Sequence, residues 1–233
     1  MTKADEIDVQ DNPVIIAGFG RFGVVIGRFL RANGVRATIL DNNPDNIQVL
    51  RKFGFKVFYG DASRHDLLRS AGASSARVII IALDDRQKIN EMTEHIKKEY
   101  PGLKILARAV DVSHSFELED LEVNGHRRET YDSSVELGAM ALSELGFQHY
   151  QAFRLARSFR HHDLWIMKEL HKLWKEDSNR YILAANRFAE QLENTLLAEQ
   201  NGPIHEADSA WDATTLREEV REIYNQIKKN QEE

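Results

Sequence analysis

The chain has 233 residues, with 31 lysines and arginines against 37 aspartates and glutamates, and its formal net charge at pH 7 is −6. This balance argues against a nucleic-acid-binding protein, because the neutralisation of phosphates requires a concentrated basic surface. The absence of cysteine excludes disulfides, thiolate metal sites and thiol chemistry, and it fits a reducing compartment.

The first twelve residues, MTKADEIDVQDN, are polar and acidic, unlike a signal peptide, which is basic and then apolar. No later stretch approaches the roughly 20 apolar residues needed to cross a bilayer. We therefore expect the chain as given to be soluble.

Short apolar runs alternate with helical segments between residues 13 and 83, which predicts a βαβαβαβ order. The runs lack alternation of apolar and polar residues, as is typical of parallel strands covered on both faces. The predicted strands are 13–18, 36–41, 55–60 and 76–83, and the predicted helices are 21–34, 43–54 and 63–72. Asn43 and Ser63 are the predicted N-caps, and Gly34, Gly54 and Gly72 are the predicted C-terminal glycines.

The pattern continues with a helix over 85–100, a strand over 104–110, a helix over 111–123 and a weaker sixth strand over 127–131. The sequence therefore predicts an α/β fold over 13–131, a Rossmann-type, doubly wound parallel sheet of six strands.

After residue 131 the strand signal ends, and 133–145, 150–174 and 179–198 are predicted helices. We interpret 132–200 as a helical dimerisation and peripheral extension, and 201–233 as a linker and C-terminal tail with a last helix over 214–229. An apolar stripe on the middle helix indicates either an internal core or a dimer interface. Its members are Phe153, Phe159, Ile166, Leu170, Leu173 and Trp174.

The segment GFGRFG, Gly18 to Gly23, follows a strand and begins a helix, which is the context of a dinucleotide-binding loop. Gly18 permits the tight turn, Gly20 lets a phosphate approach the backbone, and Gly23 allows close packing of helix on strand. Free N–H groups at the start of the helix would hold the phosphate.

Asp41 ends the second strand about 20 residues later and can accept hydrogen bonds from a ribose diol. Asp61 either flanks the adenine or caps the next helix, and the sequence does not decide between them. Arg108 and Glu129 either reach toward the phosphate and ribose or pair with each other or their neighbours. The predicted nucleotide-binding residues are Gly18, Gly20, Arg21, Phe22, Gly23, Asp41, Asn42, Asp61, Ala62, Arg108 and Glu129.

A hydride-transfer enzyme would need an acid/base on a second wall of the crevice. The nine histidines offer no such arrangement, and His161 and His162 point in different directions on a helix, so we predict neither catalytic residues nor a metal site. The nucleotide is expected to signal or stabilise, and the protein is not expected to be an enzyme.

The motifs GFGRFG, LRKFG, VFYGDAS and RET together resemble the regulator-of-K⁺-conductance (RCK) domains, also called K⁺-transport, nucleotide-binding domains. More narrowly, residues 13–174 resemble the cytosolic C-terminal domain of the Kef glutathione-gated potassium efflux systems. The resemblance implies that 1–12 is the end of a linker from an inner-membrane antiporter domain of the same chain.

The resemblance also implies a homodimer with AMP or NAD(H) in each crevice, glutathione or its S-conjugates bound between subunits, and an ancillary flavin oxidoreductase subunit. The implied glutathione ligands are Arg28, Phe53, Arg128 and Asp163. Two arginines suit the two carboxylates of glutathione. Asp163 stands where a relative has asparagine, so its carboxylate could meet only the ammonium group. Phe53 would be a wedge that a bulky S-substituent displaces.

Two other functions stay open at this stage. One is an NAD-dependent dehydrogenase that uses the same crevice, and the other is a generic RCK module that responds to nucleotide alone. The gating hypothesis requires a ligand with different affinities for two dimer states, because equal affinities shift no equilibrium.

Overall fold

The structure is a computed structural model that describes residues 12–44, 50–52, 54–175 and 178–201. Residue contacts divide the chain into two units, 1–131 and 132–233. The predicted linker at the N-terminus, except Asn12, and the predicted tail and last helix beyond residue 201 lie outside the described residues.

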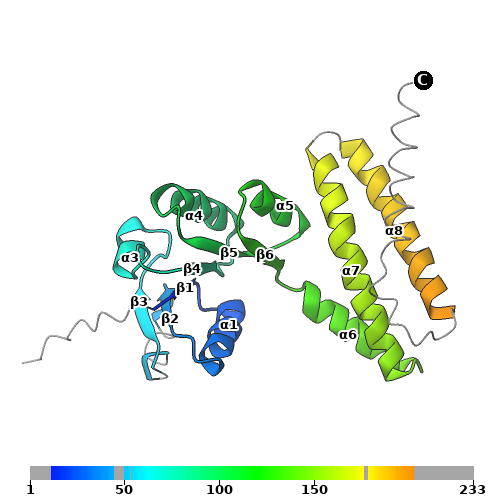
Figure 1. Cartoon of the computed structure of the whole chain (residues 1–233), viewed down its shortest axis with the longest axis horizontal. Helices are drawn as coiled ribbons and strands as arrows, with labels where there is room; N and C mark the ends of the chain where they lie inside the picture. Colours follow the sequence, from blue (N-terminus) through cyan, green and yellow to red (C-terminus); the bar gives the residue numbers. More distant parts are fainter. Residues whose placement is uncertain (1–11, 45–49, 53, 176–177, 202–233) are drawn as a thin grey trace, which may run out of the picture. The chain divides into compact units, whose positions relative to one another are not determined.

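The first unit is built on a six-stranded sheet in the order β3-β2-β1-β4-β5-β6, and every neighbouring pair is parallel (Figure 1). The strands are β1 (Val14–Ala17), β2 (Ala37–Asp41), β3 (Lys56–Tyr59), β4 (Val78–Ile81), β5 (Lys104–Ala109) and β6 (Gly125–Arg128). The predicted fold class is confirmed. The strand order reverses beside β1, between β1 and β4, which is where open parallel sheets form their ligand crevice.

Helices cover both faces of this sheet, and each face has its own apolar core (Figure 1). They are α1 (Arg21–Ala32), α3 (His65–Ser70), α4 (Arg86–Glu99) and α5 (Val112–Asp120). On one face Val24, Ile26 and Leu30 of α1 pack against Ile16 and Ile39. The opposite core is formed by α3, α4, α5 and the other side of the strands, with fully buried Ile89, Met92 and Leu118.

Glycines end the helices where the sequence predicts them, because Gly34, Gly54 and Gly72 have φ values of +73°, +76° and +88°. The prediction that Ser63 caps a helix is wrong. Its hydroxyl donates to Asp61 at 2.8 Å, and α3 begins only at His65. Of the predicted helix over 43–54, the described residues 50–52 are helical.

The sixth strand is also displaced from its prediction. It covers Gly125–Arg128, so Glu129 follows the strand and does not lie within it. The backbone N–H of Glu129 still donates to the carbonyl of Ala109 at 3.0 Å, but the chain then begins a helix at Tyr131.

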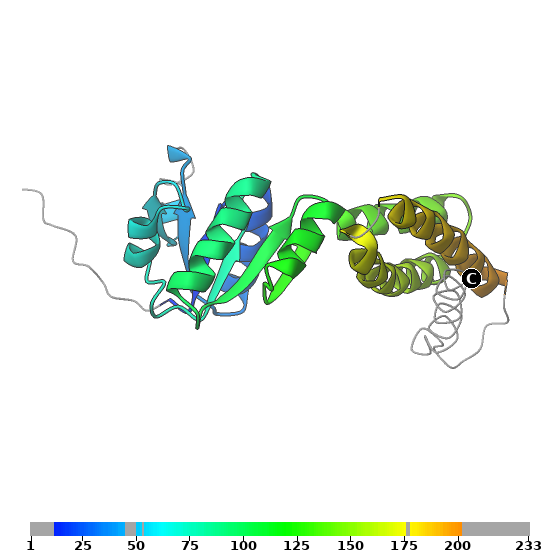
Figure 2. The same cartoon turned by 90° about the horizontal axis from the view of Figure 1, so that it is seen from above.

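The second unit is helical, with α6 (Tyr131–Glu144), α7 (His149–Trp174) and α8 (Ser178–Asn201) (Figure 2). Helices α7 and α8 pack together, and the rings of Trp165 and Phe188 lie 5.8 Å apart. Of the predicted stripe on α7, Ile166 and Leu170 are buried within the chain, which matches the internal-core interpretation for these two positions. The other four members are only partly buried.

Candidate functional site

The glycine loop between β1 and α1 has a backbone that side chains would disrupt. Gly18 has a φ of +90°, and a Cβ there would lie 2.9 Å from the carbonyl oxygen of Ala82. A Cβ on Gly23 would lie 2.1 Å from the carbonyl oxygen of Gly18, so this glycine permits close contact of helix and loop. A Cβ on Gly20 would meet no atom within 4 Å. The space above Gly20 is therefore open to a ligand at the start of α1.

The carboxylate of Asp41 fastens this loop to the end of β2. One oxygen accepts the backbone N–H of Phe19 at 2.6 Å, and the other accepts the N–H of Asn43 at 2.7 Å. Asp41 is buried, whereas its neighbour Asn42 is exposed. Each carboxylate oxygen has a second lone pair, so the side chain can still accept hydrogen bonds from a ribose diol.

A buried arginine lies at the carboxyl ends of β4 and β5. The guanidinium of Arg108 contacts the carboxylates of both Asp84 and Glu129. It also lies 5.8 Å from the centre of the Phe22 ring, within the range of a cation–π contact. The pairing of Arg108 with Glu129, one of the two interpretations of the sequence, is thus present. Among the described residues, Nε of Arg108 is buried without a hydrogen-bond partner.

The predicted residues on the outer parts of the crevice are less constrained. Arg21 is almost fully exposed and lies 3.8 Å from Glu129. Asp61 accepts both the backbone N–H and the hydroxyl of Ser63, and it lies 3.3 Å from the Nζ of Lys88. The hydrogen bonds from Ser63 are the main cause of the lowered pKa of Asp61. Ala62 beside it is buried.

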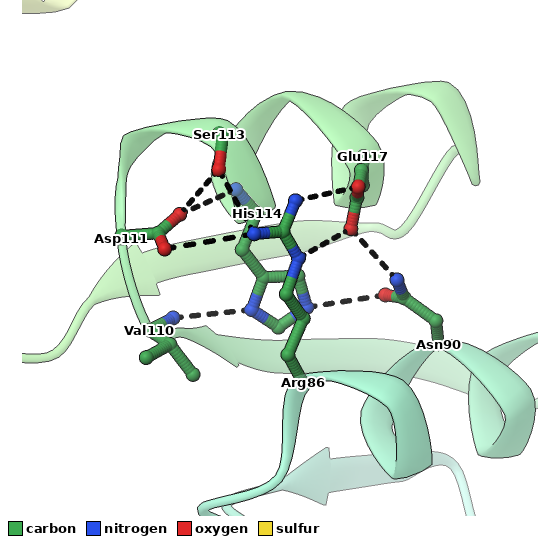
Figure 3. Close-up of polar contacts among 7 residues, drawn as sticks. All are labelled: Arg86, Asn90, Val110, Asp111, Ser113, His114 and Glu117. Atoms are coloured by element: carbon green, nitrogen blue, oxygen red, sulfur yellow. Dashed lines mark hydrogen bonds and ion pairs between the residues drawn. The ribbon is translucent and has the colours of Figure 1, made fainter.

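A polar network that the sequence did not reveal joins α4 to α5 (Figure 3). Arg86 donates to both oxygens of Glu117 at 2.5 and 2.8 Å, and Asn90 donates to Glu117 at 2.8 Å. Only the N-cap signal of Asp111, which accepts the N–H of His114 at 2.7 Å, was available in the sequence. Partners 27 to 31 residues apart leave no local pattern.

His114 is completely buried at the centre of this network. Its Nδ1 accepts the N–H of Val110 at 3.1 Å, and its Nε2 lies 3.1 Å from the side-chain oxygen of Asn90. This pattern requires the neutral ring with its proton on Nε2. Burial lowers the pKa of His114, which agrees with a neutral ring.

The predicted glutathione ligands lie in both units. Arg28 is exposed on α1, and the guanidinium of Arg128 lies 3.8 Å from the ring centre of Tyr131. Asp163 belongs to α7 in the second unit, and Phe53 lies outside the described residues. Their assembly into one site stays a prediction.

The described residues include no group of three or more side chains that could hold a metal ion. No described helix is both long and apolar enough to span a bilayer.

Comparison with known proteins connects this geometry to a family. Residues 14–125 match the TrkA-N domain model, and residues 133–210 match the model of the potassium efflux system KefB C-terminal domain. A solved Shewanella denitrificans Kef C-terminal domain in its AMP-bound form is 46% identical, with a TM-score of 0.64, and the match covers 69% of this chain and 98% of that one. The chain belongs to the Kef C-terminal domains. The resemblance found in the sequence is thereby confirmed.

Two further proteins are similar to this Kef domain, one in sequence and one in fold. The glutathione-regulated potassium-efflux system protein KefC of Escherichia coli O139:H28 is 48% identical over 168 residues, which are 72% of this chain and 27% of that protein. The chain thus spans about a quarter of the length of the curated relatives it matches. The TrkA-N domain of the inner membrane protein ybaL from Escherichia coli shares the fold at 19% identity and a TM-score of 0.50, with 58% of this chain and 97% of that one covered.

Proposed function

We propose that this Kef domain is the ligand-sensing regulatory domain of a potassium efflux system that exchanges K⁺ for H⁺. AMP or NAD(H) binds in the crevice, glutathione holds the transporter closed, and glutathione S-conjugates open it during electrophile stress. The observation that carries the proposal is the 46% identity to a Kef domain described as AMP-bound, across nearly all of that chain.

The crevice geometry supports a bound nucleotide. Gly20 leaves open space at the start of α1, where N–H groups and the helix dipole favour a phosphate. Asp41 is fixed by two backbone donors and retains lone pairs for a ribose diol. A carboxylate at this position disfavours a 2′-phosphate, so AMP and NAD(H) fit better than NADP(H).

The network around His114 supports a regulatory role over a dehydrogenase. An acid/base in hydride transfer must exchange a proton with the substrate. Both ring nitrogens of His114 are engaged inside the protein, and the ring is fully buried. This histidine of the sheet's carboxyl edge is therefore not available for that chemistry.

The second unit supports a homodimer. On α6 the apolar side chains of Leu137 and Met140 are 66% and 54% exposed, and Leu145, just after the helix, is 78% exposed. Large apolar side chains grouped on one short segment are typical of a surface that a partner covers. In this proposal glutathione binds between the two copies and contacts Arg28 and Arg128. The ancillary flavin oxidoreductase subunit would dock on this dimer.

Isothermal titration calorimetry of the AMP-saturated chain tests the proposal. Glutathione and a bulky S-conjugate should compete for one site, and Arg128→Ala should weaken both while it leaves AMP affinity unchanged. Arg127→Ala, the exposed neighbour, is the matched control. A chain that binds AMP but neither glutathione nor its S-conjugate would instead be a generic RCK module.

A further inference from the structure

The edge of the sheet opposite the nucleotide crevice has a cavity of about 420 Å³. It lies where β2 and β3 begin and where α1 ends. Asn12, Arg31, Arg36, Phe55 and Lys56 are among the residues that line it. Because all strands are parallel, this cavity and the crevice lie at opposite ends of the strands.

The lining of this cavity is basic. Among the described residues, the lining includes the cations Arg31, Arg36 and Lys56 and no aspartate or glutamate. Within the described part of the chain, no carboxylate forms an ion pair with Arg31 or Lys56. The positive charges of Arg31 and Lys56 are therefore not paired with a carboxylate of the described residues.

Two contacts fix the walls of the cavity. The guanidinium of Arg31 lies 5.2 Å from the centre of the Phe55 ring, a cation–π contact that orients it. The buried side chain of Asn12 donates to the hydroxyl of Thr38 at 3.1 Å. The cavity is consequently bordered by a stacked arginine and a fixed amide.

Charge is distributed unevenly between the two edges of the sheet. A cation stands at the start of four strands, directly before it or as its first residue: Arg36, Lys56, Arg77 and Lys104. The carboxyl ends of the strands carry the acids Asp41, Asp61, Asp84, Asp85, Asp111 and Glu129, together with the cations Arg108 and Arg128. Arg77 and Lys104 thus add positive charge at the edge where the cavity lies, although the whole chain is acidic.

We propose that this cavity is a second anion-binding site, which takes a phosphate group independently of the crevice. Side chains must hold the phosphate, because the backbone N–H groups of Gly34, Gly54 and Phe55 already donate to carbonyls of the chain. Arg31 lines the cavity from α1, and Lys56 lines it from β3, where its Nζ also lies 5.6 Å from the centre of the Phe58 ring. Such cations suit the several oxygens of a phosphate. The group could belong to a soluble phosphate compound or to an anionic lipid headgroup.

Amide NMR spectra of the whole chain titrated with pyrophosphate test the site directly. We expect the amides of Gly34, Gly54 and Lys56 to shift, and the double variant Arg31→Gln, Lys56→Gln to bind about tenfold more weakly. The matched control removes two exposed cations outside the cavity, Arg69→Gln with Lys98→Gln, and should bind as the wild type does. The amides of Gly18 and Gly20 report separately on the crevice, so failure at one site is distinguishable from failure at the other.

Sedimentation with vesicles of phosphatidylcholine alone, or with added phosphatidylglycerol, distinguishes the sources of the phosphate. Binding to the anionic vesicles that the double variant loses identifies a lipid headgroup, and binding to pyrophosphate alone identifies a soluble compound. If neither probe binds, or if both bind the double variant as well as the wild type, the proposal is overturned. If the double variant fails to fold, the single variant Lys56→Gln replaces it in both binding measurements.

Discussion

The carboxylate of Asp41 accepts the backbone N–H of Phe19 at 2.6 Å, so the end of β2 holds the glycine loop that follows β1. The two residues are 22 positions apart. The aspartate expected to bind a ribose therefore also shapes the loop expected to bind the phosphate.

We predict that Asp41→Asn weakens AMP binding and destabilises the first unit together. The amide group would place an N–H donor against a backbone N–H, which leaves a buried donor unsatisfied at a cost of about 1–3 kcal/mol. Calorimetry and urea denaturation measure the two effects. Glu94→Gln, an exposed substitution on α4, is the control. If Asp41→Asn loses AMP affinity but keeps its stability, the carboxylate binds the ribose without stabilising the fold.

Alanine at Gly20 should lower AMP affinity alone, whereas alanine at Gly23 should also lower thermal stability. The Cβ of Gly20→Ala meets open space, and its φ of −70° suits alanine, so the variant should fold normally and lose AMP affinity. The Cβ of Gly23→Ala would lie 2.1 Å from the carbonyl oxygen of Gly18, so this variant should also melt at a lower temperature. Thermal denaturation with and without AMP checks both. Normal AMP binding by Gly20→Ala would place the phosphate elsewhere.

Arg108→Leu should be strongly destabilising, because it leaves the carboxylate of Glu129 beside an apolar side chain. Loss of one partner of a buried ion pair typically costs about 3–5 kcal/mol. The exposure of Asp84, the other partner, places the expected loss toward the lower end of that range. Removal of both charges with Arg108→Leu, Glu129→Leu should recover part of the loss in urea denaturation, and a double variant no more stable than the single one would contradict this coupling.

Acidification from pH 7.5 to 5.5 should lower the free energy of unfolding. Burial lowers the pKa of His114 below its ordinary value of 6.5, so the unfolded chain binds more protons as the pH falls through that value. The contribution of neutral His114 to the free energy of unfolding is therefore fully present above about pH 6.5. It is lost as the pH falls below that value, by at most about 1.4 kcal/mol per pH unit. His95 adds to the effect, because burial and the nearby His65 lower its pKa too.

Urea denaturation at several pH values measures this slope. The acids with lowered pKa, among them Asp111 and Glu117, lose their contribution only in more acidic solution, since their ordinary values are 3.8 and 4.5. His95→Gln should make the slope smaller. A stability that is constant or rises between pH 7.5 and 5.5 would contradict a buried neutral His114.

The sequence predicted β1 to β5 well because these strands contain short apolar runs between glycines and helix caps, which are local signals. The polar strand β6 has no such run and was displaced from its prediction. The sequence also predicted the residues at the carboxyl ends of the strands, since parallel strands bring these ends together. It could not predict that Asp41 holds Phe19 or that Arg86 reaches Glu117, because these partners are brought together only by the fold. The misplaced cap at Ser63 has a local origin, since its hydroxyl donates to Asp61 two residues earlier in the chain.

A crystal structure of the whole chain with AMP and glutathione tests the central claim most directly. The account predicts that the phosphate lies over Gly20, that the ribose contacts Asp41, and that glutathione bridges two chains in contact with Arg28 and Arg128. A nucleotide outside the crevice, or a tripeptide bound within one chain away from both arginines, would contradict it.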